Sequence, residues 1–152
     1  MTHLTRRRAL ATGTTLAASL ASPRLSAQPK YDPGASDTEI KLGHTSPYSG
    51  PLSAFSVAGK ATTAYFNMIN AAGGINGRKI TFISYDDGYQ PPKTVEMVRK
   101  LVESDQVLLI FQLLGTPTNI AIQKYLNQKQ IPQLFTGTER LSTSPARGRR
   151  HQ

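Results

Sequence analysis

The chain has 152 residues, 38% of them hydrophobic, and a formal net charge of +9. This length fits about one globular domain, and the absence of cysteine excludes disulfides and thiolate metal sites. The excess charge lies at the two ends, because residues 28–146 hold 11 basic and 9 acidic side chains. Since no basic stripe remains to follow a phosphate backbone, the composition argues against nucleic acid as a partner.

The N-terminal segment has the pattern of an export signal. Arg6, Arg7 and Arg8 precede a mildly apolar run, and Ala27 offers a small residue for cleavage. We therefore predict that residues 1–27 are a cleaved signal peptide of the twin-arginine type. The apolar run is too short and too interrupted to span a bilayer. The predicted location is the periplasm.

The first predicted elements are a strand and a long helix. Two prolines and a glycine in residues 28–36 predict a flexible lead-in. Alternating apolar residues at 38–43 predict a strand, followed by a loop at 45–51. From Leu52, apolar and small residues recur at steps of three and four, which predicts a helix with a broad apolar face. The residues assigned to that face include Phe55, Gly59, Tyr65, Phe66, Met68 and Ile69.

Glycines and a proline mark the next two boundaries. Gly73 or Gly74 can cap the first helix in a left-handed conformation, and Asn76–Gly77 can form a tight turn. Strong β-formers at residues 80–85 predict a second strand. Pro91 or Pro92 is suited to open a second helix, since the first helical turn needs no proline N–H. The residues predicted to be buried on this helix are Val95, Val98, Leu101 and Val102.

The remaining elements repeat the alternation. A continuous apolar run at 107–111 predicts a strand buried on both faces, as in a parallel sheet. A third helix is predicted at 118–127 and a fourth strand at 131–135. The order β-α-β-α-β-α-β is typical of a doubly wound α/β sheet with parallel strands.

After Thr136 this alternation stops. Residues 137–152 are rich in Ser, Pro and Arg and show no apolar period, which predicts an aberrant or disordered basic tail. We expect the product to be a truncation with a frame-shifted end. A natural short form with a disordered end is the alternative.

One stretch of the sequence resembles a known family. Residues 70–80 read N-A-A-G-G-I-N-G-R-K-I and lead into a strand that ends at Asp86–Asp87. This run is similar to one in the periplasmic leucine/isoleucine/valine-binding proteins, and the resemblance to that family extends over residues 38–135. The resemblance implies that residues 37–136 are the incomplete N-terminal lobe of a type I periplasmic binding protein.

The resemblance also implies a function. It implies a substrate-binding component of an ABC import system, with an amino acid of the branched-chain kind as ligand and a membrane permease as partner. Such receptors bind without chemistry, so neither catalysis nor a cofactor is expected. Because two lobes close over the solute in that family, a single lobe is expected to bind weakly or not at all. A ligand-sensing receptor or regulator of the same fold is the alternative, ahead of an enzyme.

The loop between the third strand and the third helix is the main candidate site. In open α/β sheets, ligands bind beyond the carboxyl ends of the strands. Backbone donors and the helix dipole favour a carboxylate here, and Thr116 and Thr118 add hydroxyl groups. Either hydroxyl could instead only cap the helix.

The resemblance implies roles for individual residues. Gly115 and Thr116 match the loop that holds the ligand's α-carboxylate. Thr136 and Thr138 are similar to a second hydroxyl loop, which meets the ammonium group. Tyr48 lies where the loop after the first strand approaches the ligand.

Three other features could carry chemistry. Asp86 and Asp87 suggest a metal or acid–base pair, but no converging ligands are evident, so turn and cap hydrogen bonds are the expected role. The glycines at 73–77 precede a strand, whereas a dinucleotide-binding fingerprint follows one. His44 has no evident nucleophile partner and is interpreted as a strand-end residue. The sequence therefore predicts no metal and no cofactor.

Overall fold

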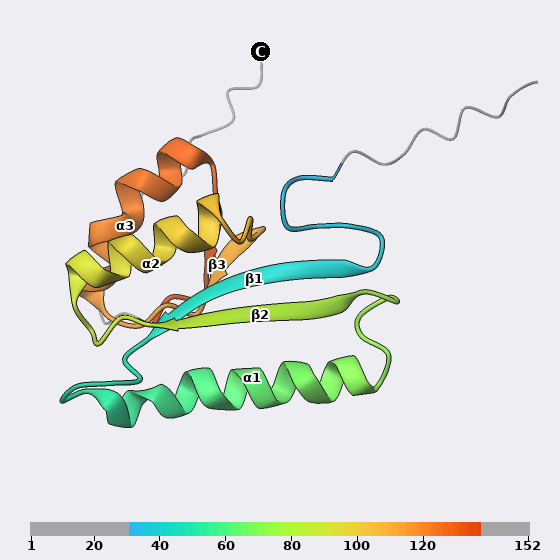
Figure 1. Ribbon diagram of the computed structural model, residues 1–152, viewed down its shortest axis with the longest axis horizontal. Helices are drawn as coiled ribbons and strands as arrows, with labels where there is room; N and C mark the ends of the chain where they lie inside the picture. Colours follow the sequence, from blue (N-terminus) through green and yellow to red (C-terminus); the bar gives the residue numbers. More distant parts are fainter. Residues whose placement is uncertain (1–30, 138–152) are drawn as a thin grey trace, which may run out of the picture.

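The computed structural model describes residues 31–137. The predicted signal peptide and residues 138–152 of the predicted basic tail, Thr138 included, lie outside this range. The predicted alternation of strands and helices is confirmed (Figure 1). The elements are β1 (Glu39–Ser46), a 3-10 turn η1 (Ser53–Phe55), α1 (Ser56–Ala71), β2 (Lys79–Asp86), α2 (Pro91–Glu103), β3 (Leu109–Phe111), α3 (Thr116–Lys129) and β4 (Gln133–Leu134).

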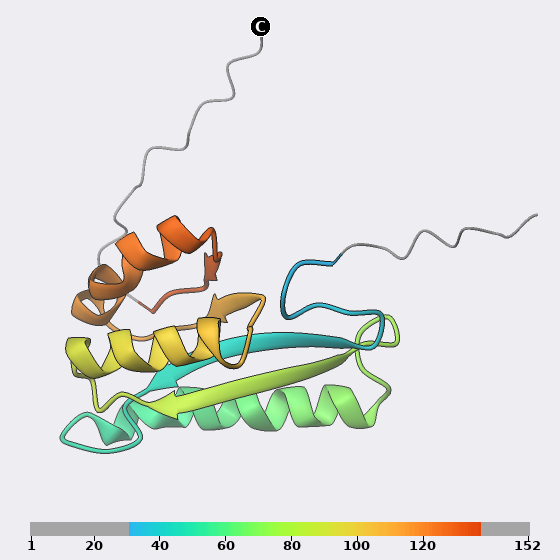
Figure 2. The ribbon, with the colours of Figure 1, turned by 45° about the horizontal axis from the view of Figure 1, so that its top comes forward.

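The strands form a single parallel sheet in the order β2-β1-β3-β4. Helix α1 covers one face of this sheet, and α2 and α3 cover the other (Figures 1 and 2). From β1 the chain passes to β2 at one edge of the sheet, and from β2 it returns to β3 on the other side of β1. The loops after β1 and β3 therefore diverge at the carboxyl edge, where doubly wound sheets bind their ligands. The predicted fold class is confirmed.

Each face of the sheet has its own hydrophobic cluster. The buried residues beneath α2 and α3 are Val98, Leu101, Val107, Ile110, Leu113, Ile122 and Leu126. The buried residues beneath α1 are Leu42, Phe66 and Ile80. Tyr65 and Met68 are 55% and 60% exposed. The apolar face of α1 is thus narrower than predicted, because the helix approaches the sheet through Gly59 and Phe66 and turns its flanks to solvent.

Strand β1 runs three residues beyond its predicted end, so His44, Thr45 and Ser46 belong to the strand and not to its end or to the following loop. All three are buried, and β1 pairs with β2 along its whole length. Their polarity concealed the strand, because the expected alternation assumes that buried positions are apolar. The fold supplies hydrogen bonds to two of these side chains: Thr45 Oγ1 donates to Asp87 Oδ2 at 2.8 Å, and His44 Nδ1 donates to the Phe111 carbonyl at 2.9 Å.

The segment predicted as a flexible lead-in forms neither helix nor strand, but its described part, residues 31–36, is bonded to β1. The Lys41 N–H donates to the Gly34 carbonyl at 2.7 Å, and the Ser36 N–H donates to the Glu39 carbonyl at 2.9 Å. Ordered structure therefore begins before the first strand.

The connection between α1 and β2 explains the sequence of residues 70–80. Gly73 and Gly74 both have positive φ, and the Gly74 N–H donates to the Ile69 carbonyl at 2.9 Å, which closes the helix as predicted. Asn76 and Gly77, also at positive φ, form the predicted turn. The Asn70 side chain then bonds both the N–H and the carbonyl of Ile80, each at 2.8 Å, and ties the helix end to the strand.

Candidate ligand-binding pocket

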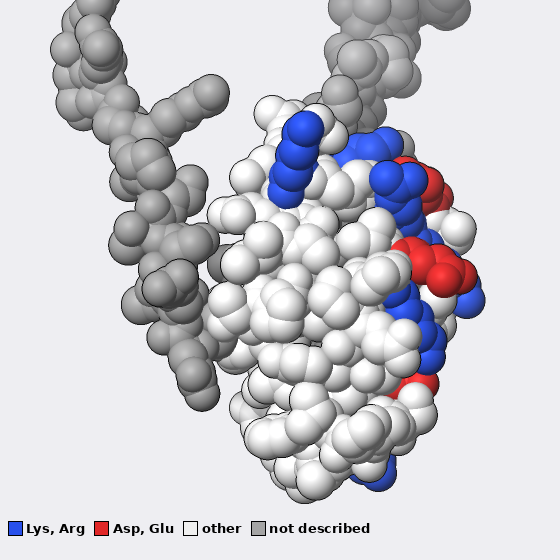
Figure 3. Space-filling view, turned by 90° about the vertical axis from the view of Figure 1, so that its left-hand side faces the viewer, with Lys and Arg blue, Asp and Glu red and all other residues white. Residues whose placement is uncertain are grey.

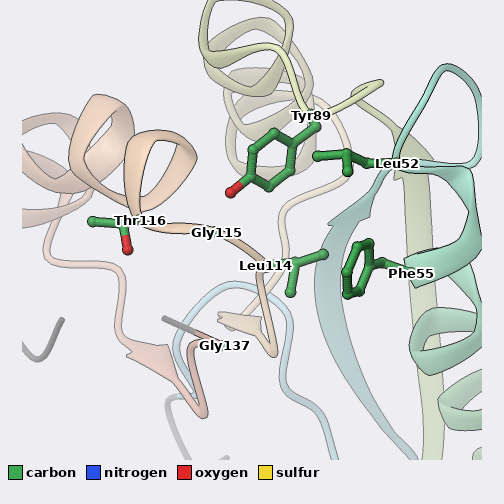
Figure 4. Close-up of a pocket in the computed structure, with 7 residues that line it drawn as sticks. All are labelled: Leu52, Phe55, Tyr89, Leu114, Gly115, Thr116 and Gly137. Carbon is green, nitrogen blue, oxygen red and sulfur yellow. The ribbon is translucent and has the colours of Figure 1, made fainter. Parts of the chain in front are cut away.

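A cavity of about 260 Å³ opens at the carboxyl ends of the strands. Its wall is formed by residues from the segments that follow all four strands: Leu52, Phe55, Tyr89, Leu114, Gly115, Thr116 and Gly137 (Figure 4). Figure 3 shows this end of the molecule, where uncharged side chains cover most of the surface and charged ones lie mainly along one margin. The pocket therefore combines an apolar wall with the polar start of α3.

The polar side of the pocket is held by bonds between two loops. The Gly115 N–H donates to the Gly137 carbonyl at 2.8 Å, and the Gly137 N–H donates to the Leu113 carbonyl at 3.0 Å. The Gly115 amide is therefore already bonded within the protein. Helix α3 begins at Thr116. In its first turn Pro117 has no N–H, and the Asn119 N–H donates to the Gly115 carbonyl at 3.1 Å. This turn presents the positive end of the helix dipole to the cavity.

Only some of the predicted site residues line the cavity. Gly115 and Thr116 line the cavity. Thr118 is buried, and its hydroxyl donates to the carbonyls of Leu114 and of Gly115, the latter at 2.8 Å. It therefore bonds carbonyl groups of the preceding loop, does not cap the helix, and is not among the residues that line the cavity.

Two further predicted residues also stand outside the lining. The Tyr48 hydroxyl pairs with Ser84 Oγ at 2.6 Å, and its ring lies beside Gly59 of α1, so its polar end is turned to β2. Thr136 is half-buried, and its neighbour Gly137 is the residue that lines the cavity. The structure thus brings Gly115, Thr116 and Gly137 together.

Five lining residues were not predicted as site residues: Leu52, Phe55, Tyr89, Leu114 and Gly137. Phe55 had been assigned to the buried face of the first helix, yet it is 53% exposed because it lies in the turn that precedes α1. Their shared signal is positional, since each lies in a segment that follows a strand at the carboxyl edge. Composition gave no signal, because apolar residues in loops are common.

The acidic pair at the end of β2 has a structural role, as expected. Asp87 is buried, and its carboxylate accepts bonds from the hydroxyls of Thr45 and Thr94 and from the Tyr89 N–H. Asp86 is bound by Lys93, Ser49 and the Gly88 N–H. These two acids fix the loop that carries Tyr89 to the pocket. Within residues 31–137, no cluster of His, Cys, Asp and Glu could hold a metal ion.

The pKa values of Asp86 and His44 are both lower than usual. Burial alone would raise the pKa of the Asp86 carboxyl, but hydrogen bonds from Lys93, Ser49 and Gly88 outweigh it and hold that pKa well below its usual value. Burial lowers the pKa of His44, against smaller opposing effects of the Phe111 carbonyl and Asp87. The His44 Nδ1–H donates to the Phe111 carbonyl at 2.9 Å, whereas Nε2 has no hydrogen-bond partner within the described residues.

We expect stability to fall when the pH is lowered from about 7.5 to 5, measured by urea unfolding monitored by circular dichroism. The pKa of His44 is lower in the folded chain than its value of about 6.5 in the unfolded chain. Between these two pKa values the unfolded chain binds more protons, so acid favours unfolding by up to about 1.4 kcal/mol per pH unit. The Asp86 carboxylate is stabilising above its unfolded pKa of about 3.9 and loses this effect only at lower pH, outside the window. The slope should disappear in His44→Gln, and an unchanged or rising stability of the parent chain at pH 5 would contradict the assignment.

The chain is similar to known proteins of one family. The model of the periplasmic binding protein family matches residues 39–149. The chain belongs to this family. The family is one of solute-binding proteins, not of enzymes, and it indicates a periplasmic location. No helix within residues 31–137 is long and apolar enough to cross a membrane.

Individual relatives match over part of their length. An amino acid binding protein of Pseudomonas aeruginosa is 30% identical over 108 residues, which are 70% of this chain and 28% of that protein. A type 1 periplasmic binding protein of Bordetella pertussis has 29% identity and a TM-score of 0.57, covering 64% of this chain and 26% of its own. The Streptococcus pneumoniae protein LivJ, a branched-chain amino acid transporter substrate-binding protein solved with isoleucine, shares the fold with a TM-score of 0.63 and 21% identity, covering 69% and 30% of the two chains. The chain thus spans less than a third of these relatives.

Proposed function

We propose that the pocket binds amino acids with a branched aliphatic side chain, as part of a receptor that presents the solute to an ABC permease. The observation that carries this proposal is the position and composition of the cavity. It lies at the carboxyl edge of a doubly wound sheet, between the first turn of α3 and a wall of Leu52, Phe55 and Leu114. The names of the amino-acid-binding relatives support the same ligand class.

The two sides of the cavity suit the two ends of such a ligand. The α-carboxylate would meet the first turn of α3 and the Thr116 hydroxyl, where backbone donors and the helix dipole favour an anion. The aliphatic side chain would lie against the apolar wall and leave water. Thr136 and Thr138 remain our candidates for the ammonium group. None of the lining residues within 31–137 is acidic, so on this described wall the ammonium would meet hydroxyl and carbonyl oxygens.

The sequence supports a route to the compartment where this receptor would act. We propose that residues 1–27 direct export by the twin-arginine pathway and that cleavage occurs near Ala27. Mass spectrometry of the protein recovered from the periplasm of a bacterial host should show a mature N-terminus close to Gln28. If the full chain, with Arg6–Arg8 intact, stayed uncleaved in the cytoplasm, the export proposal would be contradicted.

Binding can be tested by nuclear magnetic resonance, in which the 152-residue chain is titrated with L-leucine and the amide signals are followed. We expect shifts of the Gly115, Thr116 and Gly137 signals and a weak Kd, on the order of 1 mM. Weak binding is expected because Phe55 is 53% exposed, so the described wall leaves much of a ligand in water, whereas small-molecule sites usually bury about 70–90% of it.

The controls address the apolar wall. L-Lysine, which carries a charge at the end of its side chain, should bind more weakly than L-leucine by a measurable factor. Phe55→Ala should weaken leucine binding, whereas Val57→Ala, which removes a 66% exposed residue outside the lining, should not. Absence of shifts at the pocket amides, or equal binding of lysine and leucine, would contradict the proposed function.

A further inference from the structure

Tyr89 has a backbone conformation that is unusual for a large side chain. Its φ is +60°, in the left-handed region, where residues other than glycine and asparagine are uncommon and strain is concentrated at functional positions. The preceding Gly88 also has positive φ. A glycine would adopt the conformation of Tyr89 without strain. The backbone at this position therefore does not explain why a tyrosine stands there.

A buried carboxylate holds Tyr89 in this conformation. Asp87 Oδ1 accepts the Tyr89 N–H at 2.9 Å. Asp87 Oδ2 accepts the hydroxyls of Thr45 and Thr94 at 2.8 and 3.0 Å, and all three of these side chains are buried. Because the carboxylate is fixed from β1 and from α2, the loop at residue 89 is fixed by the core of the fold.

The ring of Tyr89 forms one end of the pocket. It lies against the backbone of Gly115 so closely that a Cβ atom on this glycine would be 2.4 Å from the ring atom Cε2 and 2.6 Å from the hydroxyl oxygen. Figure 4 shows the ring on the side of Leu52 and Gly115, with its oxygen pointing toward the start of α3, while Phe55 lies farther down the wall. The ring therefore takes up space beside the loop to which we assign the carboxylate.

We propose that Tyr89 is the residue that determines the size of the solute. This inference rests on the proposed binding function and adds to it a limit on the ligand. A solute whose carboxylate lies at the first turn of α3 must direct its side chain into the space that remains between Tyr89 and the apolar wall. An aliphatic side chain of three or four carbons meets the ring without moving it, whereas an aromatic side chain competes with the ring for the same space. The fixed backbone holds the Cα of Tyr89 in place, so the ring can leave this space only by a rotation of the side chain.

The test compares L-leucine and L-phenylalanine on the full chain by the same amide titration. The parent chain should prefer leucine. Tyr89→Gly removes the ring, keeps a residue suited to positive φ and should shift the ratio of the two dissociation constants at least tenfold toward phenylalanine. Tyr89→Phe keeps the ring and should retain the preference of the parent chain. Tyr65→Ala, which removes an exposed tyrosine outside the lining, should also retain it.

The outcomes separate the two proposals. If the parent chain binds leucine at the pocket amides and Tyr89→Gly keeps the same ratio, the role of Tyr89 is wrong and the proposed function stands. If neither amino acid shifts the pocket amides of the parent chain or of Tyr89→Gly, both proposals are wrong. Thermal unfolding provides the folding control, since Tyr89→Gly should melt at the same temperature as the parent chain or higher. A changed ratio in Tyr65→Ala as well would also overturn the assignment, because the effect would not depend on the pocket.

Discussion

Asp87→Ala is expected to lower the free energy of unfolding by about 3 kcal/mol, because it leaves buried donors without their acceptor. The lost bonds come from the hydroxyls of Thr45 and Thr94 and from the Tyr89 N–H. Both threonines are fully buried, so water cannot replace the carboxylate without opening the joint between β1 and α2. Urea unfolding monitored by circular dichroism measures the loss.

The neighbouring acid provides a matched control. Asp86 accepts bonds from Lys93 and Ser49, but its side chain is 31% exposed and water can take over part of this bonding. Asp86→Ala is therefore expected to cost about 1 kcal/mol or less. If Asp87→Ala were no more destabilising than Asp86→Ala, the carboxylate of Asp87 would not be the support of the pocket loop that the structure indicates.

Gly115→Ala is expected to reduce leucine binding at least tenfold and to lower stability by about 1–3 kcal/mol. Gly115 has φ of +95°, which strains any residue with a Cβ, and the added Cβ would collide with the Tyr89 ring. Relief of that collision moves either the ring or the start of α3, and both line the pocket. Amide titration with L-leucine measures the first effect, and urea unfolding measures the second.

Backbone strain and collision can be separated with a second glycine. Gly73 has φ of +102°, and a Cβ there would meet nothing within 4 Å. Gly73→Ala should therefore destabilise the fold through strain alone and leave binding unchanged. In the double variant Gly115→Ala with Tyr89→Gly the collision is absent, so the stability should recover in part relative to Gly115→Ala. Equal loss of binding in the Gly73 and Gly115 variants would show that global destabilisation, and not the pocket, is responsible.

Most of the fold could be predicted because local signals and tertiary packing agree. Proline at the start of α2, glycine after α1 and the apolar run that contains β3 each identify an element by a mechanism that acts within a few residues. The end of β1 could not be predicted in this way, because Thr45 and Ser46 are polar and buried. The buried hydroxyl of Thr45 has its partner in Asp87, 42 residues away in the sequence, and a local pattern cannot show such a partner.

The candidate site was predicted less completely than the fold. The rule that ligands bind at the carboxyl edge pointed to the loop of Gly115 and Thr116, and these residues line the cavity. The hydroxyl groups of Thr118 and Tyr48 are instead bonded inside the protein. Residue type alone cannot distinguish a hydroxyl that faces a ligand from one that bonds a nearby carbonyl. Tyr89 escaped notice because its role depends on a positive φ and on contact with a loop that follows another strand.

The central claim is that the cavity between the apolar wall and the first turn of α3 is where the solute binds. Intermolecular nuclear Overhauser effects test it most directly, with carbon-13-labelled protein and unlabelled L-leucine. We predict contacts from the leucine methyl protons to the side chains of Leu52, Phe55 and Leu114, and from the leucine Hα to Thr116. Contacts confined to other surfaces, or binding without any contact to this wall, would contradict the account.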